Sequence, residues 1–359
     1  IEGGNNYGWA LVEGNACFPE GVTNCDTSGM APPVMVYPNA GKGSVTGGYV
    51  YRGSEVPSLY GTYIFADYEQ DAIYLLPTEG SPPEGPTLDT PDSVAGFGQD
   101  AQGEVYVLGL MTGTIYRFVP AQPRDESAAS APFPQTLSET GCFSDLTTMT
   151  PAPGVIPYTL NHPFWSDGAE KSRWMVLPED GEIEFDPHGV WEIPEGALFI
   201  KHFEIDTLVD DAPTRTRLET RFLVQEESGV RGYTYRWNDA GTEATLLTSG
   251  DTRSLTVPSA SGATESFQWQ FPARHQCKAC HTPEAGGMLG TESAQLNREV
   301  DLHGVIENQL LTWANWGVFT GASRPADLSG LPSHPAIDDA SASLEARARS
   351  WLHVNCSSC

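Results

Sequence analysis

Short runs that alternate between apolar and polar residues dominate the first 120 positions. The runs GGYVYRG (47–53), GTYIFADY (61–68) and GEVYVLGL (103–110) follow the two-residue period of a β-strand, and turn-forming residues separate them. The turns recur at the spacing found between the strands of a propeller blade. We therefore expect residues 1–120 to form a partial β-propeller.

A second β-rich region follows residues 121–138, a segment rich in proline, serine and alanine that has the composition of a linker. Between residues 139 and 272, runs such as ALFIKHFEID (197–206) and GYTYRWN (232–238) are again typical of strands. This pattern predicts a β-rich domain that is a β-sandwich or a barrel.

The period changes in the last region, residues 273–359. The stretches VIENQLLTWANWGVF (305–319) and SASLEARARSWLHVN (341–355) space their apolar residues as a helix does. The chain is thus predicted to be multidomain and mainly β, with an α-helical, cytochrome c-like C-terminal region.

Acidic residues outnumber basic ones, with 47 Asp and Glu against 19 Lys and Arg and a formal net charge of −28. A surface of that charge repels phosphate backbones, so we expect no nucleic acid partner. No apolar run approaches the roughly 20 residues of a membrane-spanning helix, so we expect no membrane span in this chain.

The stretch RHQCKACHT (274–282) places Cys277 and Cys280 directly before His281, as Cys-x-x-Cys-His. Two thiols at this spacing can form thioethers with the two vinyl groups of haem, while the histidine ligates the iron. The motif therefore predicts haem c attached to Cys277 and Cys280, with His281 as the proximal ligand.

The chain ends on the same pattern without the histidine, at Cys356 and Cys359, directly after the last predicted helix. We expect a second, truncated haem site here, in a chain that is a piece of a longer protein. Thioether ligation favours Met288 as the distal ligand of the first haem, and His303 and His334 are the alternatives.

Other interpretations of the cysteines stay open. A structural zinc site could use two Cys-x-x-Cys pairs, although the pairs here lie farther apart than in zinc ribbons. Its ligands would be Cys277, Cys280, Cys356 and Cys359. A thioredoxin-like redox pair needs a βαβ context that the flanking residues do not suggest.

Two further sets of residues carry candidate chemistry. Cys17 and Cys25 bracket the short loop CFPEGVTNC, which predicts a disulfide and an oxidising compartment, periplasmic or secreted. The middle region holds residue types that can ligate a metal, although scattered histidines in β-rich domains are more often structural. These residues are His162, Asp167, His188 and His202.

Residues 1–120 resemble the closing blades of the glucose/sorbosone dehydrogenase family of six-bladed β-propellers, through EGGNNYGW, SVTGGYVYRGSEVPSLYGTYIFADY and GFGQDAQGEVYVLGLMTGTIYRF. The resemblance implies that earlier blades precede this chain. Family members often bind pyrroloquinoline quinone (PQQ) and calcium. Here Glu69 replaces a lysine of the PQQ-binding members, and DTPDSVAGFG replaces an Arg-x-Arg pair. A carboxylate repels the tricarboxylate cofactor, so PQQ is not expected.

Residues 136–359 are similar to a bacterial family of unknown function in which a β-rich region precedes c-type haem motifs. The similarity rests on stretches such as GVIPYTLNHPFWSDGAEKSRWMVLP, FPARHQCKACHT and ARARSWLHVNCSSC. It implies haem and identifies no substrate.

These observations predict a c-type haem protein that exchanges electrons with a redox partner or a second haem domain. One alternative is part of a haem-linked dehydrogenase whose full-length form oxidises a sugar or an alcohol, so enzymatic activity and catalytic residues stay open. The other alternative is a non-catalytic binding module in which the four cysteines hold zinc.

Overall fold

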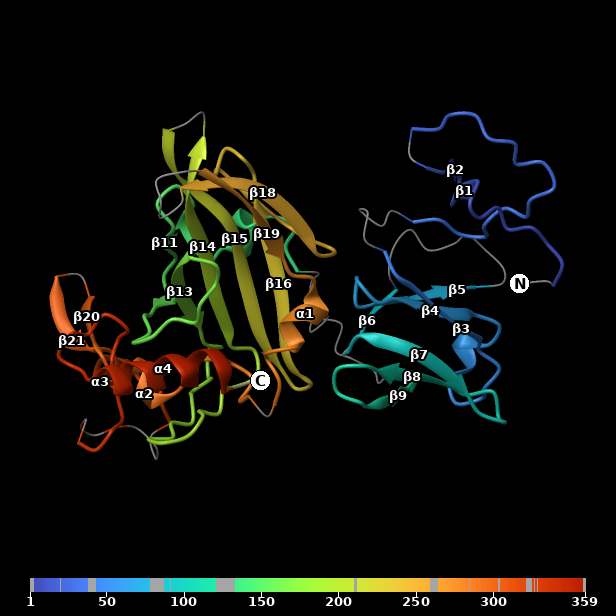
Figure 1. Cartoon of the computed structure of the whole chain (residues 1–359). Helices are drawn as coiled ribbons and strands as arrows, with labels where there is room; N and C mark the ends of the chain where they lie inside the picture. Colours follow the sequence, from blue (N-terminus) through green and yellow to red (C-terminus); the bar gives the residue numbers. More distant parts are fainter. Residues whose placement is uncertain are drawn as a thin grey trace.

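The computed structural model describes residues 3–19, 21–37, 43–77, 87–90, 92–120, 133–209, 212–258, 264–283, 285–302, 304–320, 325, 327 and 329–357. Within them the chain is mainly β, with several antiparallel sheets and four α-helices (Figure 1). None of these helices has the length and apolar composition needed to cross a membrane. The mainly β prediction is confirmed.

A hairpin and two small sheets make up the N-terminal part. The hairpin pairs β1 (Val12–Glu13) with β2 (Ala16–Cys17), and a disulfide joins Cys17 to Cys25. One sheet has four strands: β3 (Val45–Val50), β4 (Tyr63–Asp67), β5 (Ala72–Leu76) and β6 (Leu88–Asp89). The other has three: β7 (Val94–Gln99), β8 (Val105–Gly109) and β9 (Ile115–Arg117).

The two small sheets share one core, to which Tyr51 and Ile64 contribute from the first and Val105 from the second. Alternate residues of β4 and β8 supply this core because side chains of a strand point to opposite faces in turn. That these sheets are propeller blades stays a prediction. Residues 121–132 of the predicted linker lie outside the described part.

One antiparallel sheet of six strands organises the rest of the chain. Its strands, in both chain and sheet order, are β12 (Ile156–Pro157), β13 (Glu170–Val176), β14 (Leu198–Val209), β15 (Ala212–Glu226), β16 (Gly229–Trp237) and β17 (Ala244–Leu246). The hairpin of β18 (Asp251–Pro258) and β19 (Thr264–Phe271) packs against it. The described strands form an open sheet, so the barrel alternative is wrong.

Each face of this sheet is covered by a different part of the chain. Trp174, Ile200 and Phe222 share one face and pack against residues 133–155. That segment contains the 3-10 turn η3 (Ser138–Thr140) and the short strands β10 (Phe143–Asp145) and β11 (Thr150–Pro151). The opposite face is covered by residues 177–193, which connect β13 to β14, and by residues 288–319, which follow the sheet in sequence.

The C-terminal residues form short elements. These are α1 (Arg274–Lys278), α2 (Ser293–Leu296), the hairpin of β20 (Glu299–Leu302) and β21 (Val305–Asn308), α3 (Gln309–Trp316) and α4 (Leu344–Cys356). Asn308 caps α3 by accepting a hydrogen bond from the Leu310 amide, and Ser343 caps α4 by accepting one from the Ala346 amide. Glycine at 317 ends α3 in the left-handed conformation.

The predicted α-helical, cytochrome c-like C-terminal region is wrong. Met288, Leu310 and Trp313 belong to the same core as Met175 and Phe199 of the six-stranded sheet. A helical period identifies α3 and α4, but it does not say which of their apolar residues are buried. Leu310 and Trp313 of α3 enter the core, whereas Leu344 and Leu352 of α4 are exposed. Residues 288–319 therefore complete the core of the sheet, and α4 does not contribute to it.

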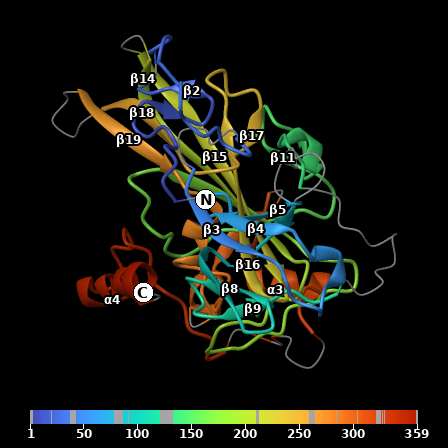
Figure 2. The same cartoon turned by 90° about the vertical axis from the view of Figure 1, so that its right-hand side faces the viewer.

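Helix α1 lies between the six-stranded sheet and the N-terminal sheets (Figure 1), and the N-terminal strands lie in front of the six-stranded sheet in the turned view (Figure 2). The ring of His275 on α1 lies 4.6 Å from that of Tyr68, centroid to centroid, and His275 is buried. On β16, Arg231 donates a hydrogen bond of 3.2 Å to the carbonyl of Thr90. These contacts join the N-terminal sheets to the surface that carries the Cys-x-x-Cys-His motif.

Candidate functional site: a basic pocket on the six-stranded sheet

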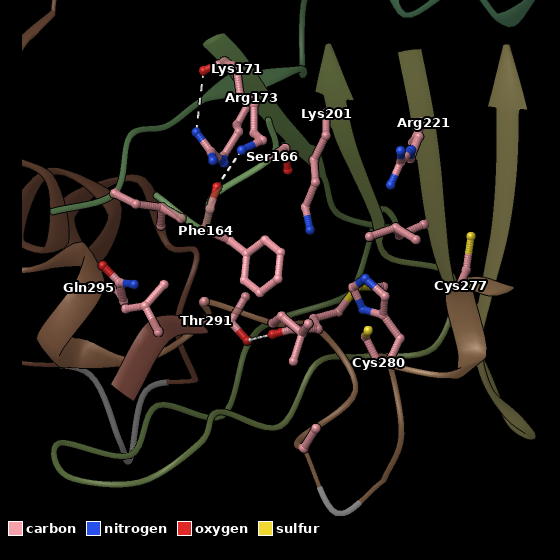
Figure 3. A pocket seen from close by; sticks show the side chains of 18 of the residues that line it. Phe164, Ser166, Lys171, Arg173, Lys201, Arg221, Cys277, Cys280, Thr291 and Gln295 are labelled. Carbon is pink, nitrogen blue, oxygen red and sulfur yellow. Dashed lines mark hydrogen bonds between the residues drawn. The ribbon is translucent and has the colours of Figure 1, made fainter. Parts of the chain in front are cut away.

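Three basic residues form a row across adjacent strands of the six-stranded sheet. Arg173 of β13 is paired in register with Lys201 of β14, and Lys201 is paired with Arg221 of β15. Lys171, two residues before Arg173, projects from the same face because strand side chains alternate. Figure 3 shows the four side chains around one pocket. Like charges opposite one another destabilise a sheet, so the row requires compensation.

Arg221 is compensated by a buried carboxylate. Glu219, fully buried, accepts hydrogen bonds of 2.8 and 2.6 Å from the Arg221 guanidinium and one of 2.9 Å from Trp269 Nε1. The guanidinium also lies 4.6 Å from the centre of the Phe203 ring. Arg221 is therefore neutralised and held in place.

The other three basic residues form no ion pair with a described carboxylate, although the charge of Asp167 acts on Lys171. Lys171 donates to the Phe164 carbonyl, and Arg173 donates to the Lys171 carbonyl at 3.3 Å. The Nε of Arg173 is buried without a hydrogen bond to a described residue. Lys201 lies between Arg173 and Arg221 in the register of the sheet, and its side chain lines the pocket. Three basic groups thus face the pocket without an ion pair.

Burial and mutual repulsion change the titration of this row. Burial, followed by the charges of Arg173 and Arg221, lowers the pKa of Lys201 to about 7 and that of Lys171 to about 7. Burial also lowers the pKa of Arg173. An anion bound beside these groups would favour their charged forms.

The pocket itself has a volume of about 320 Å³. Its apolar lining includes Phe164, Leu223, Met288 and Leu160, and Glu292 is the one acidic side chain among the residues that line it. Apolar walls with a few convergent polar groups are typical of a small-molecule site.

The Cys-x-x-Cys-His motif lines the same pocket. The side chain of Cys277 is buried against β16, where Gly232 leaves room for its sulfur. Cys280 is exposed. Burial raises the pKa of the Cys277 thiol. In a chain where Gly232 carried a Cβ, that atom would lie 2.4 Å from Cys277 Sγ.

His281 is held in one orientation. Its Nδ1 donates to the Gly287 carbonyl at 2.7 Å, so Nε2 is the nitrogen left for a ligand. Burial, followed by the charge of Lys201, lowers the pKa of His281 to about 3. A neutral imidazole oriented through its other nitrogen suits metal ligation, so His281 fits the predicted role of haem ligand.

The remaining predicted haem residues are placed as follows. Met288 is buried and lines the pocket that His281 lines. Cys356 is exposed at the end of α4, and His334 lies beside Glu292. Cys359 and His303 lie outside the described residues. Haem attachment is tested by none of these observations and stays a prediction.

Among the described residues, one group has side chains close enough to share a metal ion: Glu292, His334 and His353. The described cysteines of the zinc alternative form no such group. Neither do the four residues of the middle region that the sequence offers as metal ligands, His162, Asp167, His188 and His202. Of these, His202 hydrogen-bonds to Thr220 Oγ1 at 2.8 Å within the sheet.

Sequence reasoning missed the basic row. Each of its members stands in a strand-like run, EKSRWMV, LFIKHFEI or LETRFLV, in a chain with few basic residues. The sequence offered one sign of this row: basic residues stand at strand positions where a buried strand usually has apolar ones. Their alignment depends on strand register, which the runs do not specify.

Comparison with known proteins gives three partial similarities. HIPL2 protein of Arabidopsis thaliana is 27% identical over 154 residues, covering 32% of this chain and 21% of that protein. HIPL1 protein of the same plant is 35% identical over 85 residues, covering 21% and 12%. Hedgehog-interacting protein of Homo sapiens is 33% identical over 128 residues, covering 30% and 18%. The matches thus span less than a quarter of each relative. No family model and no solved structure matches the chain.

These relatives correct the sequence-based identification. They are neither PQQ-type dehydrogenases nor cytochromes, so both predicted family resemblances are contradicted. The predictions of a c-type haem electron-transfer protein and of a haem-linked dehydrogenase are contradicted with them. A five-residue motif carries little information about the rest of a chain, and the strand pattern is shared by many β proteins.

Proposed function

We propose that this chain belongs to a secreted or periplasmic binding protein whose pocket takes a small carboxylate with an apolar body. The observation that supports the proposal is the set of Lys171, Arg173 and Lys201, three basic residues that line the pocket and form no ion pair with a described carboxylate. The Cys17–Cys25 disulfide supports an oxidising compartment.

The charge of the whole chain makes this concentration of cations informative. With a net charge of −28, the protein repels anions at long range. A row of opposed cations destabilises the sheet, and a bound carboxylate offsets that cost by charge-assisted hydrogen bonds. The row of basic residues therefore favours the binding of an anionic ligand and lowers the stability of the unliganded sheet.

The apolar lining supports the second half of the proposal. Phe164, Leu223 and Met288 border the basic row and remove apolar surface from water when a ligand covers them. A ligand with a carboxylate at one end and an apolar body at the other would use both parts of the pocket.

Covalent haem at Cys277 and Cys280 would also combine carboxylates with an apolar body, because its two propionates are carried on an apolar ring. His281 would then supply Nε2 to the iron, and the basic row would supply cations for the carboxylates. The haem stays a proposal, and it implies no electron transfer. An absorbance spectrum of the purified, denatured protein distinguishes a covalent haem from a reversibly bound carboxylate.

The proposal is tested by comparing two probes that share a ten-carbon chain and differ in the head group, decanoate and decanol, in displacement of the fluorescent anion 1-anilinonaphthalene-8-sulfonate. Decanoate is expected to bind at least about tenfold more tightly than decanol, since a charge-assisted hydrogen bond contributes ~1.5–3 kcal/mol. Lys201→Met should remove most of that difference. Arg117→Met, a change at an exposed residue paired with Glu55, is the control and should not alter it. Equal affinities in the wild-type protein would refute the proposal.

A second candidate function is binding of another protein through residues 3–37. One relative is named Hedgehog-interacting protein. In this chain Trp9 is 73% exposed and its ring lies 5.0 Å from that of Phe18, centroid to centroid, and Leu11 and Val34 are exposed as well. Exposed apolar clusters of this kind are typical of protein interaction sites. Cross-linking in the extracellular fraction of the source organism should give a defined adduct that Trp9→Ser/Leu11→Ser abolishes, and an unchanged adduct would count against this surface.

A further inference from the structure

Glu292, His334 and His353 converge from three separate segments. Glu292 precedes α2, His334 lies between α3 and α4, and His353 stands in the last turn of α4. His353 Nε2 lies 3.0 and 3.2 Å from the two Glu292 carboxylate oxygens, and His334 Nε2 lies 3.5 Å from the nearer one. We propose that these three side chains form a binding site for a divalent transition metal, with zinc as the best match.

The distances agree with a tetrahedral zinc centre. At zinc–ligand bonds near 2.0–2.1 Å, neighbouring ligand atoms of a tetrahedron lie about 3.3 Å apart. The ligand atoms of the three residues all lie within 4.8 Å of one another. Only small side-chain movements are therefore needed to place all three around one ion, and a water molecule can take the fourth position.

The histidines are oriented as metal ligands. His334 Nδ1 lies 3.4 Å from Ser350 Oγ on α4, which leaves Nε2 directed at Glu292. That Nε2 is buried and makes no hydrogen bond to a described residue. Ser350 is itself 3% exposed, as expected for a residue that orients a ligand from behind. Two histidines and a carboxylate with an open position are a ligand set that zinc and related metals use.

The site would fasten α4 to the body of the protein. His353 and Glu292 both line the basic pocket, so the metal would sit at the rim of that pocket. Besides these contacts, α4 is held through the Asn355 carboxamide, which accepts a hydrogen bond of 2.8 Å from the Trp165 amide. The metal would therefore fix the position of α4 over one side of the pocket.

The experiment is a zinc titration of the full chain, with its disulfide intact, against a chromophoric chelator, with wild-type protein and the single variants His334→Ala and His353→Ala. We expect one equivalent of zinc and at least about a tenfold loss of affinity in each variant. If an alanine variant fails to fold, Glu292→Gln, which keeps the shape of the side chain, takes its place. It should show the same loss of affinity.

Two controls separate this site from others. His188→Ala removes an exposed histidine outside the cluster and should leave zinc binding unchanged. Cys277→Ala/Cys280→Ala should leave it unchanged too, because the proposed site uses no thiolate. Zinc binding that is absent in the wild-type protein, that survives both histidine variants, or that disappears in the cysteine variant would overturn the proposal.

Discussion

Arg173 and Lys201 lie directly opposite each other on β13 and β14, inside a pocket and without a carboxylate between them. Most sheets avoid this arrangement because opposed like charges cost stability. In a strongly acidic chain, this pair lowers the stability of the fold and favours the binding of an anion. The first prediction follows from that conflict.

Replacement of Lys201 by methionine is expected to stabilise the folded protein while it weakens anion binding. Methionine has a similar length, relieves the repulsion by Arg173 and Arg221, and needs no hydration. We expect a gain of about 1 kcal/mol in the free energy of unfolding at pH 6, measured by urea denaturation. Arg117→Met, at an exposed site, should change this free energy little, and a destabilised Lys201→Met protein would contradict the prediction.

Stability should also depend on pH in a window set by this row. The pKa of Lys201 is about 7 in the folded protein, against roughly 10.4 in an unfolded chain. Between these values the unfolded chain holds a proton that the folded chain has released. The free energy of unfolding therefore rises with pH from about 7 to about 10. Urea titrations across this range should show a smaller rise in Lys201→Met, and identical slopes would count against the lowered pKa.

The buried carboxylate of Glu219 should be essential for the site. Glu219→Gln leaves the guanidinium of Arg221 partly buried without its counter-charge, and it weakens the acceptor for Trp269. We expect a loss of about 3 kcal/mol in the free energy of unfolding. Glu265→Gln, at an exposed position of β19, is the matched control. A loss as small as that of the control would show that the pair is dispensable.

Close packing of α1 on β16 gives a further prediction. A Cβ on residue 232 would lie 2.4 Å from Cys277 Sγ, so Gly232→Ala should destabilise the protein by about 1–3 kcal/mol. Gly98→Ala, where a Cβ meets nothing within 4 Å, should have a much smaller effect. Adding Cys277→Ala should recover part of the loss, and strict additivity of the two changes would contradict the contact.

The strand content of this protein could be predicted from its sequence, and the arrangement of the strands could not. Period-two alternation is a local property, so ALFIKHFEID indicates β14 without reference to its neighbours. The position of Lys201 beside Arg173 and Arg221 depends on strand register, which the hydrophobic pattern and the turns determine together.

The same limit applies to the C-terminal region. The helical period indicates α4, yet His353 meets Glu292 across 61 positions of sequence, and only the folded chain brings them together. The Cys-x-x-Cys-His motif was visible in the sequence, whereas the cations that share its pocket were not. A motif shows which chemistry a few residues permit, and their surroundings decide which ligand they receive.

The most direct test of the central proposal is the affinity of the wild-type protein for decanoate and for decanol at pH 6 and at pH 8.5. Lys201 and Lys171 each have a pKa of about 7, so both lose their positive charge when the pH rises from 6 to 8.5. Decanoate should therefore bind several-fold more weakly at pH 8.5, while the affinity for decanol should stay constant. If decanoate binds no better than decanol at pH 6, or if both respond equally to pH, the basic row is not an anion-binding site.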